Sequence, residues 1–573
     1  MLRYEVWAPS AAAVGLEVDG RRFDLAVDGG GWWTTDEIVP ESGARYGFSV
    51  DGSDPLPDPR SPSQPDGVHA ASEWVDNTAF AWTDHDWRGV PLAGAVLYEL
   101  HVGTFTPGGT FDDAIAMLPY LRGLGADAVE VMPVASFPGE RGWGYDGVGL
   151  FAPHAAYGGP DAMKRFVDAC HDHGIGVVLD VVYNHLGPSG NYLGRFGPYF
   201  SERHHTNWGP AVNLDGPGSD EVRRFVVDNA LMWLRDYHVD GLRLDAVHAL
   251  VDDSAVHLLE QLADEVAALS SHVRRPLFLV AESDLNDPRF VRSHDAGGFE
   301  LDASWADEWH HALRSVLTGD TSGYYADFGT LEHLAKALRQ AWVYDGIWSE
   351  HRGRHHGRPP TGLSGSQFVV CTQNHDQVGN RAVGDRPSRN MSDGRLRIAA
   401  ALLLTSPFTP MLFQGEEWGT TTPFQYFTDH DDPELGRAVS EGRRNEFSYF
   451  GWDPADVPDP QDRSTFERSK LDWSEFDDDI HRSMSDWYRE LIGLRRAFPC
   501  LSDPRLDRID VEVDADSRTL TVRRGDIDVL VNLGTGTHRF PTSGRLIAAS
   551  DPAVVVRDGE AVVPLDAVAL VHR

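Results

Sequence analysis

Cysteine is scarce in this sequence, and long apolar runs are missing. The three cysteines, Cys170, Cys371 and Cys500, are odd in number and far apart, which argues against a disulfide framework or a zinc-binding spacing. The N-terminus, Met1-Leu-Arg-Tyr-Glu-Val-Trp7, lacks the apolar segment of a signal peptide, and there is no apolar run of about 18 residues or more. We therefore expect a cytoplasmic protein without a membrane span.

Positive charge is also limited, with 50 Lys and Arg residues against 88 Asp and Glu residues. The formal net charge of −38 argues against nucleic acid or an anionic membrane as a partner. A neutral ligand is compatible with this charge, which usually means a solvated acidic surface and could also reflect a salty cytoplasm. The 17 Trp residues are a high number, and exposed Trp or Tyr rings would suit weakly polar ligands such as sugars.

With 573 residues, the chain is too long for one ordinary core, so two to four domains are expected. Both ends are rich in short strands between turns. Residues 1–92 predict a small immunoglobulin-like β-sandwich, and residues 501–573 predict a small C-terminal β-domain. The strands expected there are 4–7, 14–18, 32–33 and 46–50, and then 509–513, 520–523, 529–532 and 561–564.

The central region, residues 93–500, alternates apolar strands with helices. This pattern predicts an α/β fold, a parallel (β/α)8 TIM barrel, with a doubly wound sheet as the alternative. Two excursions, 186–218 and 305–362, are expected to build the ligand cleft. The expected strands are 96–102, 128–133, 176–182, 241–245, 277–281, a weaker 298–302, 367–372 and 410–413, and helices are expected at 111–125, 161–173 and 219–237, the last capped by Ser219.

The fourth expected strand carries Arg243 and Asp245 within Asp240-Gly-Leu-Arg-Leu-Asp-Ala-Val-His248. Side chains two residues apart on a strand point to the same side, and either charge buried alone would cost several kcal/mol. The two residues are interpreted either as a structural ion pair or as a nucleophilic carboxylate that the arginine keeps ionised.

Other polar residues also follow the expected strands. The active site of a (β/α)8 barrel lies at the C-terminal ends of its strands, where this sequence has Asp245, Glu282, Asp376, His185 and His375. Three carboxylates without a Lys fit glycoside hydrolysis, with Asp245 as nucleophile and Glu282 as a general acid of raised pKa. Asp376 and the histidines would bind sugar hydroxyls. Core packing or zinc ligation is the alternative for the histidines, but no His-Glu-x-x-His spacing supports zinc.

Four of these stretches carry a family resemblance. Asp180-Val-Val-Tyr-Asn-His185, Gly241-Leu-Arg-Leu-Asp245, Glu282 and Asn374-His-Asp376 resemble, in order, the signature regions of the α-amylase family of glycoside hydrolases. The resemblance implies a retaining mechanism with Asp245 as nucleophile, Glu282 as acid/base and Asp376 as transition-state stabiliser. It also implies that Tyr145 stacks on the sugar at the cleavage site, and Val6-Trp-Ala-Pro9 resembles the β-sandwich that precedes the barrel in branching and debranching members.

A narrower resemblance, to maltooligosyltrehalose trehalohydrolases, covers nearly the whole chain through residues 98–105, 190–194, 242–248, 281–288, 324–329 and 373–380. Asp284-Leu-Asn-Asp-Pro288 is the most telling stretch, since branching enzymes carry a different sequence there. The resemblance implies hydrolysis of the α-1,4 bond next to a terminal α,α-trehalose unit, in trehalose biosynthesis downstream of a maltooligosyltrehalose synthase. The substrate-binding residues then expected are His185, Arg243, Leu244, Ala246, Val247, His248, His375, Gln377, Val378, Gly379 and Asn380.

That activity needs a pocket for trehalose on the leaving-group side. The candidate is the stretch of Asp307, Glu308, Trp309, His310 and His311, because polar groups beside a Trp face suit a disaccharide; the start of an amphipathic helix explains the same residues. No cofactor or metal is expected, since residues 186–218 lack an Asp-x-Asp-x-Asp cluster of the kind that binds calcium.

Two other functions stay open. A glucan branching or debranching enzyme would differ in its products. A non-enzymatic glucan-binding protein on the same fold predicts the loss of at least one of Asp245, Glu282 and Asp376, and all three are present.

Overall fold

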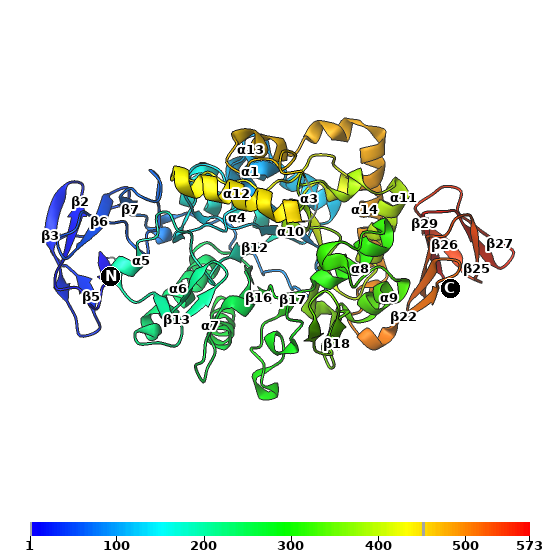
Figure 1. Cartoon of the computed structure of the whole chain (residues 1–573), viewed down its shortest axis with the longest axis horizontal. Helices are drawn as coiled ribbons and strands as arrows, with labels where there is room; N and C mark the ends of the chain where they lie inside the picture. Colours follow the sequence, from blue (N-terminus) through cyan, green and yellow to red (C-terminus); the bar gives the residue numbers. More distant parts are fainter. Residues whose placement is uncertain (1–2, 450–452) are drawn as a thin grey trace.

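A closed barrel of eight parallel strands lies at the centre of the molecule (Figure 1). The computed structural model describes residues 3–449 and 453–573. The strands follow one another in chain order around the barrel, and the last pairs with the first. The predicted (β/α)8 barrel is therefore confirmed. The strand bounds are β8 Leu97–Leu100, β9 Ala128–Val131, β12 Gly176–Val181, β15 Gly241–Leu244, β16 Phe278–Ala281, β17 Ala303–Trp305, β20 Phe368–Cys371 and β21 Thr409–Phe413.

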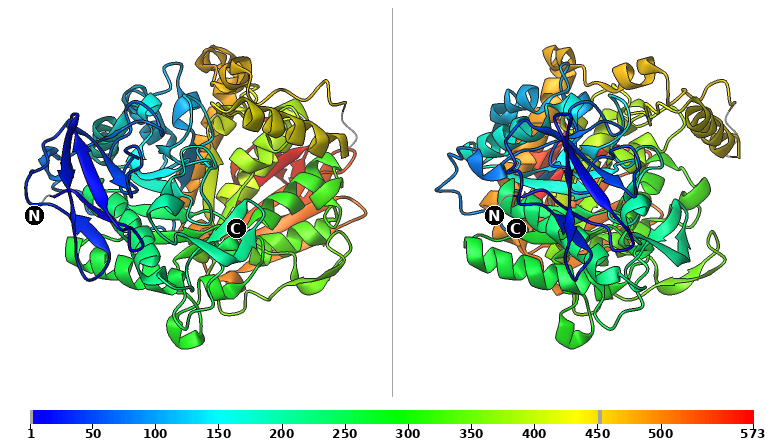
Figure 2. Two further views of the ribbon diagram at one scale, coloured as in Figure 1. Left: turned by 60° about the vertical axis from the view of Figure 1, so that its left-hand side comes forward. Right: turned by 90° about the vertical axis from the view of Figure 1, so that its left-hand side faces the viewer.

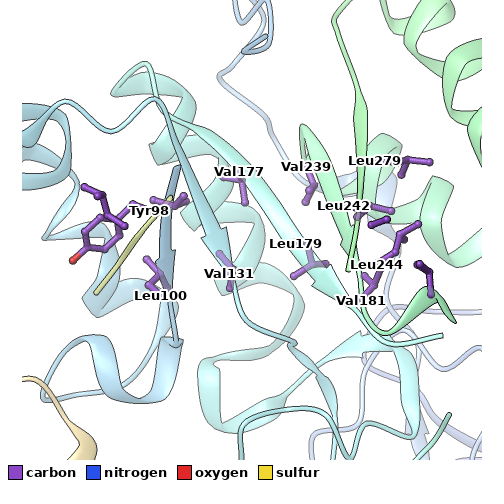
Figure 3. Packing of buried hydrophobic residues seen from close by; sticks show 14 of the residues in the cluster. Tyr98, Leu100, Val131, Val177, Leu179, Val181, Val239, Leu242, Leu244 and Leu279 are labelled. Carbon is purple, nitrogen blue, oxygen red and sulfur yellow. The ribbon is translucent and has the colours of Figure 1, made fainter. Parts of the chain in front are cut away.

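These strands are short runs in which nearly every residue is apolar and buried, as in parallel sheets that are covered on both faces. Alternate residues separate into two layers. Leu179, Leu242 and Leu279 belong to the large cluster outside the barrel, and Figure 3 shows them packed together. Val178 and Val280 belong to the cluster that fills the barrel interior. Polar residues in the same alternation as Val178 and Val280 therefore project inward.

The sixth strand was predicted wrongly at 298–302, because the structure has β17 at Ala303–Trp305. Glu300 adopts a left-handed backbone with φ of 60°, which lies outside the extended conformation of a regular strand. The chain enters the barrel only after Asp302, whose carboxylate accepts a hydrogen bond from the Leu279 N–H at 2.8 Å. The other seven strands agree with prediction to within two residues at either end.

Two helix predictions also need correction. The helix expected at 111–125 is broken into α2 (Phe111–Ile115) and α3 (Leu118–Leu124), since Pro119 has no N–H to donate to the carbonyl four residues earlier. Ser219 is the first residue of α6 and not its cap, because Gly218 is the N-cap, with φ of 80°. The bounds of other helices are α1 Val102–Phe105, α4 Gly159–Asp172, α6 Ser219–Asp236, α7 Leu258–Val273, α10 His375–Gly379, α11 Asp393–Leu404, α12 Pro433–Tyr449, α13 Arg463–Ser469, α14 Asp479–Ala497 and α15 Pro499–Ser502.

Insertions follow the barrel strands β9, β12 and β17. A short antiparallel pair, β10 (Ala135–Ser136) and β11 (Gly149–Pro153), comes after β9. The excursion at 186–218 contains α5 (Leu193–Phe196) and the hairpin of β13 (Phe200–Thr206) and β14 (Gly209–Val212). The excursion at 305–362 contains α8 (Asp307–Thr318), α9 (Leu331–Gln340) and the hairpin of β18 (Asp345–Ser349) and β19 (Arg354–Gly357).

Antiparallel sheets stand at the two ends of the long axis, with the barrel between them (Figures 1 and 2). All eight strands expected at these ends are present, and the domain boundaries at 92/93 and 500/501 stay predictions, the second falling inside α15. In residues 3–449 and 453–573, no helix is long and apolar enough to cross a membrane. The N-terminal strands are β1 Glu5–Trp7, β2 Val14–Val18, β3 Arg21–Asp24, β4 Ala26–Val27, β5 Trp32–Thr34, β6 Arg45–Val50 and β7 Ser72–Glu73, and the C-terminal strands are β22 Ile509–Asp514, β23 Thr519–Arg524, β24 Ile527–Asn532, β25 His538–Pro541, β26 Arg545–Ala549, β27 Val555–Arg557, β28 Glu560–Val563 and β29 Ala567–His572.

Candidate active site

Arg243 lies at the centre of the candidate site, inside the barrel on β15, with its side chain 0% exposed. Its Nη1 donates to both carboxylate oxygens of Asp180, at 2.9 and 2.7 Å, and to Oδ1 of Asp245 at 2.9 Å. Its Nη2 lies 3.5 Å from Oε2 of Glu282, and the guanidinium stands 4.2 Å above the centre of the Trp305 ring. The charge contact that the strand period predicted is thus present, and one buried cation joins three carboxylates.

Asp245 is held from a second side by Asn184, which follows β12. The amide Nδ2 of Asn184 donates to Oδ2 of Asp245 at 2.7 Å and to its backbone oxygen at 2.9 Å. His185 Nδ1 bonds Asn184 Oδ1 at 2.5 Å, and the His185 ring stacks on Trp208 of the first excursion, with centres 5.1 Å apart. The Asp245 carboxylate therefore has one fixed orientation at the mouth of the barrel.

Glu282 follows β16 on the neighbouring strand. Its Oε2 accepts a hydrogen bond at 2.5 Å from the N–H of Ala246, a residue with a left-handed backbone (φ of 40°) directly after Asp245. Burial, reinforced by the nearby carboxylates of Asp245, Asp376 and Asp307, raises the pKa of Glu282 to about 8, although Arg243 opposes the shift. Glu282 therefore holds a proton at neutral pH.

Asp376 lies in the first turn of α10, after the side chain of Asn374 has capped that helix. Its Oδ1 accepts a hydrogen bond from Nδ2 of Asn380 at 3.0 Å, and its Oδ2 lies 3.5 Å from Nε2 of His375. His375 Nδ1 bonds Glu99 Oε1 at 2.5 Å. Burial alone would lower the pKa of His375, but Asp376 and Glu99 raise it to about 9, so this imidazole is cationic beside the third carboxylate.

Tyr145 connects the two halves of the site. Its hydroxyl donates to Oδ2 of Asp180 at 2.6 Å and contacts Nε2 of His375 at 2.8 Å. Its ring also stacks on His375, with centres 5.2 Å apart and an interplanar angle of 24°. The ring is therefore fixed at the floor of the site.

A small cavity adjoins the carboxylates on the side of the second excursion. Burial, together with the Asp376 charge, raises the pKa of Asp307 in its wall to about 6. Its walls supply carboxylates, an amide, an imidazole, a phenol and a guanidinium, which together can accept and donate hydrogen bonds to many hydroxyls. The polar lining includes Asp284, Asn286, Asp307, His311, Tyr324 and Arg352.

The five residues predicted at 307–311 lie on α8 and separate by helical phase. Asp307, Glu308 and His311 line the cavity. The Glu308 carboxylate is already occupied by the N–H groups of Val343 and Tyr344, at 2.6 and 2.7 Å. The structure does not bring Trp309 or His310 to the cavity: both are buried, and His310 Nδ1 bonds the carbonyl of Thr372 at 2.6 Å.

The remaining predicted substrate-binding residues occupy mixed positions. The hydrophobic core takes up the side chains of Leu244 and Val247, and Ala246 reaches Glu282 through its backbone alone. His248 is exposed at the rim. The other four follow Asp376 around α10: Gln377 and Val378 are buried, Gly379 packs so closely on Trp143 that a side chain would collide with it, and Asn380 is exposed.

Several residues of the site were not predicted. Asn184 lies within the stretch 180–185 that resembles a signature region, but no role was predicted for it. Trp305, whose ring packs against the Arg243 guanidinium, belongs to the sixth strand, which was predicted at the wrong residues. Asp180 and Glu99 are acidic residues within short apolar strands, at positions that project into the barrel. An acidic residue in such a strand was the available signal, because a buried charge needs a partner.

A cluster of His204, Asp215 and Asp253 lies at the edge of the first excursion. One imidazole nitrogen and one oxygen of each carboxylate, atoms of the kind that can bind a metal ion, lie within 4.8 Å of one another. Arg203 Nη2 lies 3.4 Å from Asp253 and 4.0 Å from Asp215, and His204 Nε2 lies 3.1 Å from Asp215. These contacts join Arg203 and the three side chains of the cluster. Sequence spacing could not show this cluster, since Asp253 comes from outside the excursion.

Taken together, the geometry provides an oriented carboxylate, a carboxyl that keeps its proton, and a third carboxylate beside a cation. These groups can attack an acetal carbon, protonate the departing oxygen and stabilise positive charge on the sugar ring.

Comparison with known proteins agrees with this chemistry. The chain matches the family model "Alpha amylase, catalytic domain" over residues 63–208. Malto-oligosyltrehalose trehalohydrolases from Arthrobacter ramosus and Rhizobium sp. (strain M-11) are 53% and 51% identical to it, over 98% and 96% of this chain and 98% and 94% of theirs. A solved structure of a putative alpha amylase from Salmonella typhimurium superposes with a TM-score of 0.92 at 38% identity, over 100% of this chain and 97% of that one.

Proposed function

Because the chain belongs to the malto-oligosyltrehalose trehalohydrolase family and is thus a glycoside hydrolase of the α-amylase type, we propose that it releases trehalose from maltooligosyltrehalose. The bond cleaved is the α-1,4-glucosidic bond next to the terminal α,α-trehalose unit, and the other product is a maltooligosaccharide. The observation that carries the proposed chemistry is the pairing of Asp245, bound by Arg243 and Asn184, with Glu282, whose pKa is raised to about 8.

The proposed reaction proceeds in two displacements with retention of configuration. Asp245 forms a bond to the anomeric carbon while the bond from that carbon to the glycosidic oxygen breaks, and Glu282 gives its proton to that oxygen, which leaves as a hydroxyl of trehalose. A water molecule then gives a proton to Glu282, and its oxygen displaces Asp245. Asp376 binds hydroxyls of the reacting sugar and stabilises its oxocarbenium-like state, and Arg243, Tyr145, His185 and His375 form the surrounding sugar site.

We also propose that the cavity beside Asp307 receives the trehalose unit. Its lining can bond the hydroxyls of a disaccharide, and Tyr324, with 38% of its surface exposed, offers an apolar face to a sugar ring. A linear glucan that placed its groups differently would leave buried donors unpaired, at about 1–3 kcal/mol each. We expect the disaccharide to be recognised through hydrogen bonds to Asp284, Asp307, His311 and Arg352.

The cellular compartment and the source of the substrate are also proposals. We expect the enzyme to work in the cytoplasm on a neutral oligosaccharide made by a maltooligosyltrehalose synthase. The three cysteines, all free in the structure, support a reducing compartment, and the net charge of −38 supports an uncharged substrate.

The substrate is tested by product analysis. Purified protein is incubated separately with maltooligosyltrehalose, a linear maltooligosaccharide of equal length and a branched glucan, and the products are separated by chromatography. Trehalose as the main product of the first, with slower turnover of the other two, is expected. Faster turnover of branched glucan, or formation of new branches, would favour a debranching or branching enzyme instead.

Asp245→Asn tests the nucleophile. The substitution keeps the shape of the side chain and removes its charge, so we expect kcat to fall by about 10³-fold or more while the protein stays folded. Steady-state kinetics and a melting curve measure the two effects. Activity within about tenfold of the parent would show that Asp245 does not form the covalent bond.

A further inference from the structure

Helix α12 (Pro433–Tyr449) lies outside the barrel and crosses in front of it beside α10 (Figure 1). Its Arg443 points inward, with 9% of the side chain exposed, whereas the neighbouring Arg444 is 39% exposed and pairs with Asp459 at 3.0 Å. An inward-facing arginine on a peripheral helix requires an explanation, because desolvating a cation is costly.

The contacts of Arg443 lead to the candidate active site. One terminal nitrogen donates to the carbonyl of Gly379, and the other donates to Oδ1 of Asn380 at 3.3 Å. Its guanidinium also lies 5.1 Å from the ring centre of Tyr426. The carboxylate in ion-pair range is that of Glu446, at 3.5 Å and itself 53% exposed, so the pairing at the protein surface is weak.

Asn380 is the link between Arg443 and Asp376. Its Oδ1 accepts from Arg443, and its Nδ2 donates to Oδ1 of Asp376 at 3.0 Å. The side-chain amide of Asn380 can rotate so that its oxygen and nitrogen exchange places. If the oxygen faced Asp376, the amide and the carboxylate would repel each other. An arginine on the far side of the amide forces the oxygen outward and leaves the N–H groups facing Asp376.

We propose that Arg443 is a positioning residue for Asp376, acting through the amide of Asn380, and that α12 is in this way a functional part of the site. The proposal rests on the role of Asp376 in the proposed function. Asp376 works on the transition state, so a loosened carboxylate should lower kcat much more than it raises KM. Misplacement of a catalytic group by about 1 Å can cost about 100-fold in rate.

The test compares Arg443→Met with Arg443→Lys, Asn380→Ala and the double variant Arg443→Met/Asn380→Ala, with Arg444→Met as the matched control on the same helix. Kinetics are measured on maltooligosyltrehalose and on linear maltooligosaccharide. We expect kcat to fall about 10- to 100-fold in Arg443→Met with KM changed by less than about threefold, partial recovery in Arg443→Lys, and parent-like kinetics in Arg444→Met. In the double variant, loss of Arg443 should cost little beyond the loss of Asn380.

The proposal would be overturned if the losses of kcat in the two single variants multiplied in the double variant, or if Arg444→Met lost as much kcat as Arg443→Met. Arg443 would then act only by holding α12 in place. Crystal structures of the parent and Arg443→Met give a readout independent of activity: an Asn380 amide that still donates to Asp376 in the variant also overturns it. Failure of the proposed function is separate. It would appear as a parent that releases no trehalose, and the amide contact and the variant series on linear substrate would then still decide the role of Arg443. An Asp376→Asn variant that keeps its activity would overturn both the role of Asp376 and that of Arg443.

Discussion

At the scale of single residues, the proposed role of Glu282 as general acid links the pH range of the reaction to the protonation of this residue. Its pKa is raised to about 8, chiefly by burial, and a general acid must carry its proton. We therefore predict that kcat/KM is steady through neutral pH and falls as the pH rises through about 8, by tenfold for each further unit. A pH profile of kcat/KM on maltooligosyltrehalose measures this fall, and a fall centred near the ordinary glutamate value would contradict it.

The same group provides a control through stability. Its folded pKa lies above the ordinary value of 4.5, so its contribution to folding is fully present below that pH and is lost as the pH rises toward 8. Glu282→Gln removes this loss. The melting temperature of the variant relative to the parent should therefore rise between pH 5 and pH 8.

The sequence was enough to predict that three carboxylates gather at one rim of the barrel, but not which residues hold them in place. Asp245, Glu282 and Asp376 could be predicted because each follows a barrel strand, and the ends of parallel strands meet at one rim. Arg443 could not be predicted, since its contact with Asn380 joins segments 63 positions apart through helix packing. Trp309 shows the opposite failure: its neighbours line the cavity, but helical phase turns its ring into the core.

At the scale of elements, the linker between the N-terminal sheets and the barrel is fixed by a buried histidine. His171 on α4, 0% exposed, contacts Asp84 of the linker through Nδ1 at 2.8 Å and Asp240 through Nε2 at 3.0 Å. The ring of Trp87 stacks on it at 4.5 Å. Burial opposes protonation, but the bonds to Asp240 and Asp84 raise the pKa of His171. The imidazole of His171 therefore joins two carboxylates from distant segments of the chain.

This arrangement predicts a pH-dependent stability. Because the folded pKa of His171 is raised, its contribution is fully present below the unfolded value of about 6.5 and is lost as the pH rises through the folded value. His171→Gln should lower the melting temperature more at pH 6 than at pH 9, and His173→Gln, near the end of the same helix, is the control. An equal effect at both pH values would contradict the charged bridge.

Element prediction succeeded where burial is continuous and failed where single residues act on the backbone. The seven strands found within two residues of their expected ends are buried at every position and mostly apolar. The displaced sixth strand has three residues and follows the positive φ of Glu300, which no apolar pattern reveals. The broken helix at 111–125 has a regular apolar period, and Pro119 alone interrupts it.

At the scale of the whole molecule, the terminal sheets were predictable, but the surfaces that they cover were not. Trp7 of the N-terminal sheet packs edge-on against Tyr199 of the first excursion, with ring centres 5.5 Å apart. At the other end, Arg395 of α11 bonds Asp566 in the C-terminal region at 3.0 Å. Such contacts depend on how distant segments dock, about which local sequence patterns carry no information.

The charge of the whole molecule leads to a prediction about salt. A net charge of −38 destabilises the compact state through self-repulsion that extends over the surface. Attraction within individual ion pairs acts over a few ångströms, whereas repulsion between dispersed carboxylates acts over the roughly 10 Å at which 0.1 M salt begins to screen it. We therefore expect the melting temperature to rise by a few degrees as NaCl increases from about 0.02 M to 0.5 M. Scanning calorimetry in NaCl and in KCl at equal ionic strength separates screening from the binding of a particular cation, and a melting temperature that falls with both salts would mean that the surface ion pairs outweigh the repulsion.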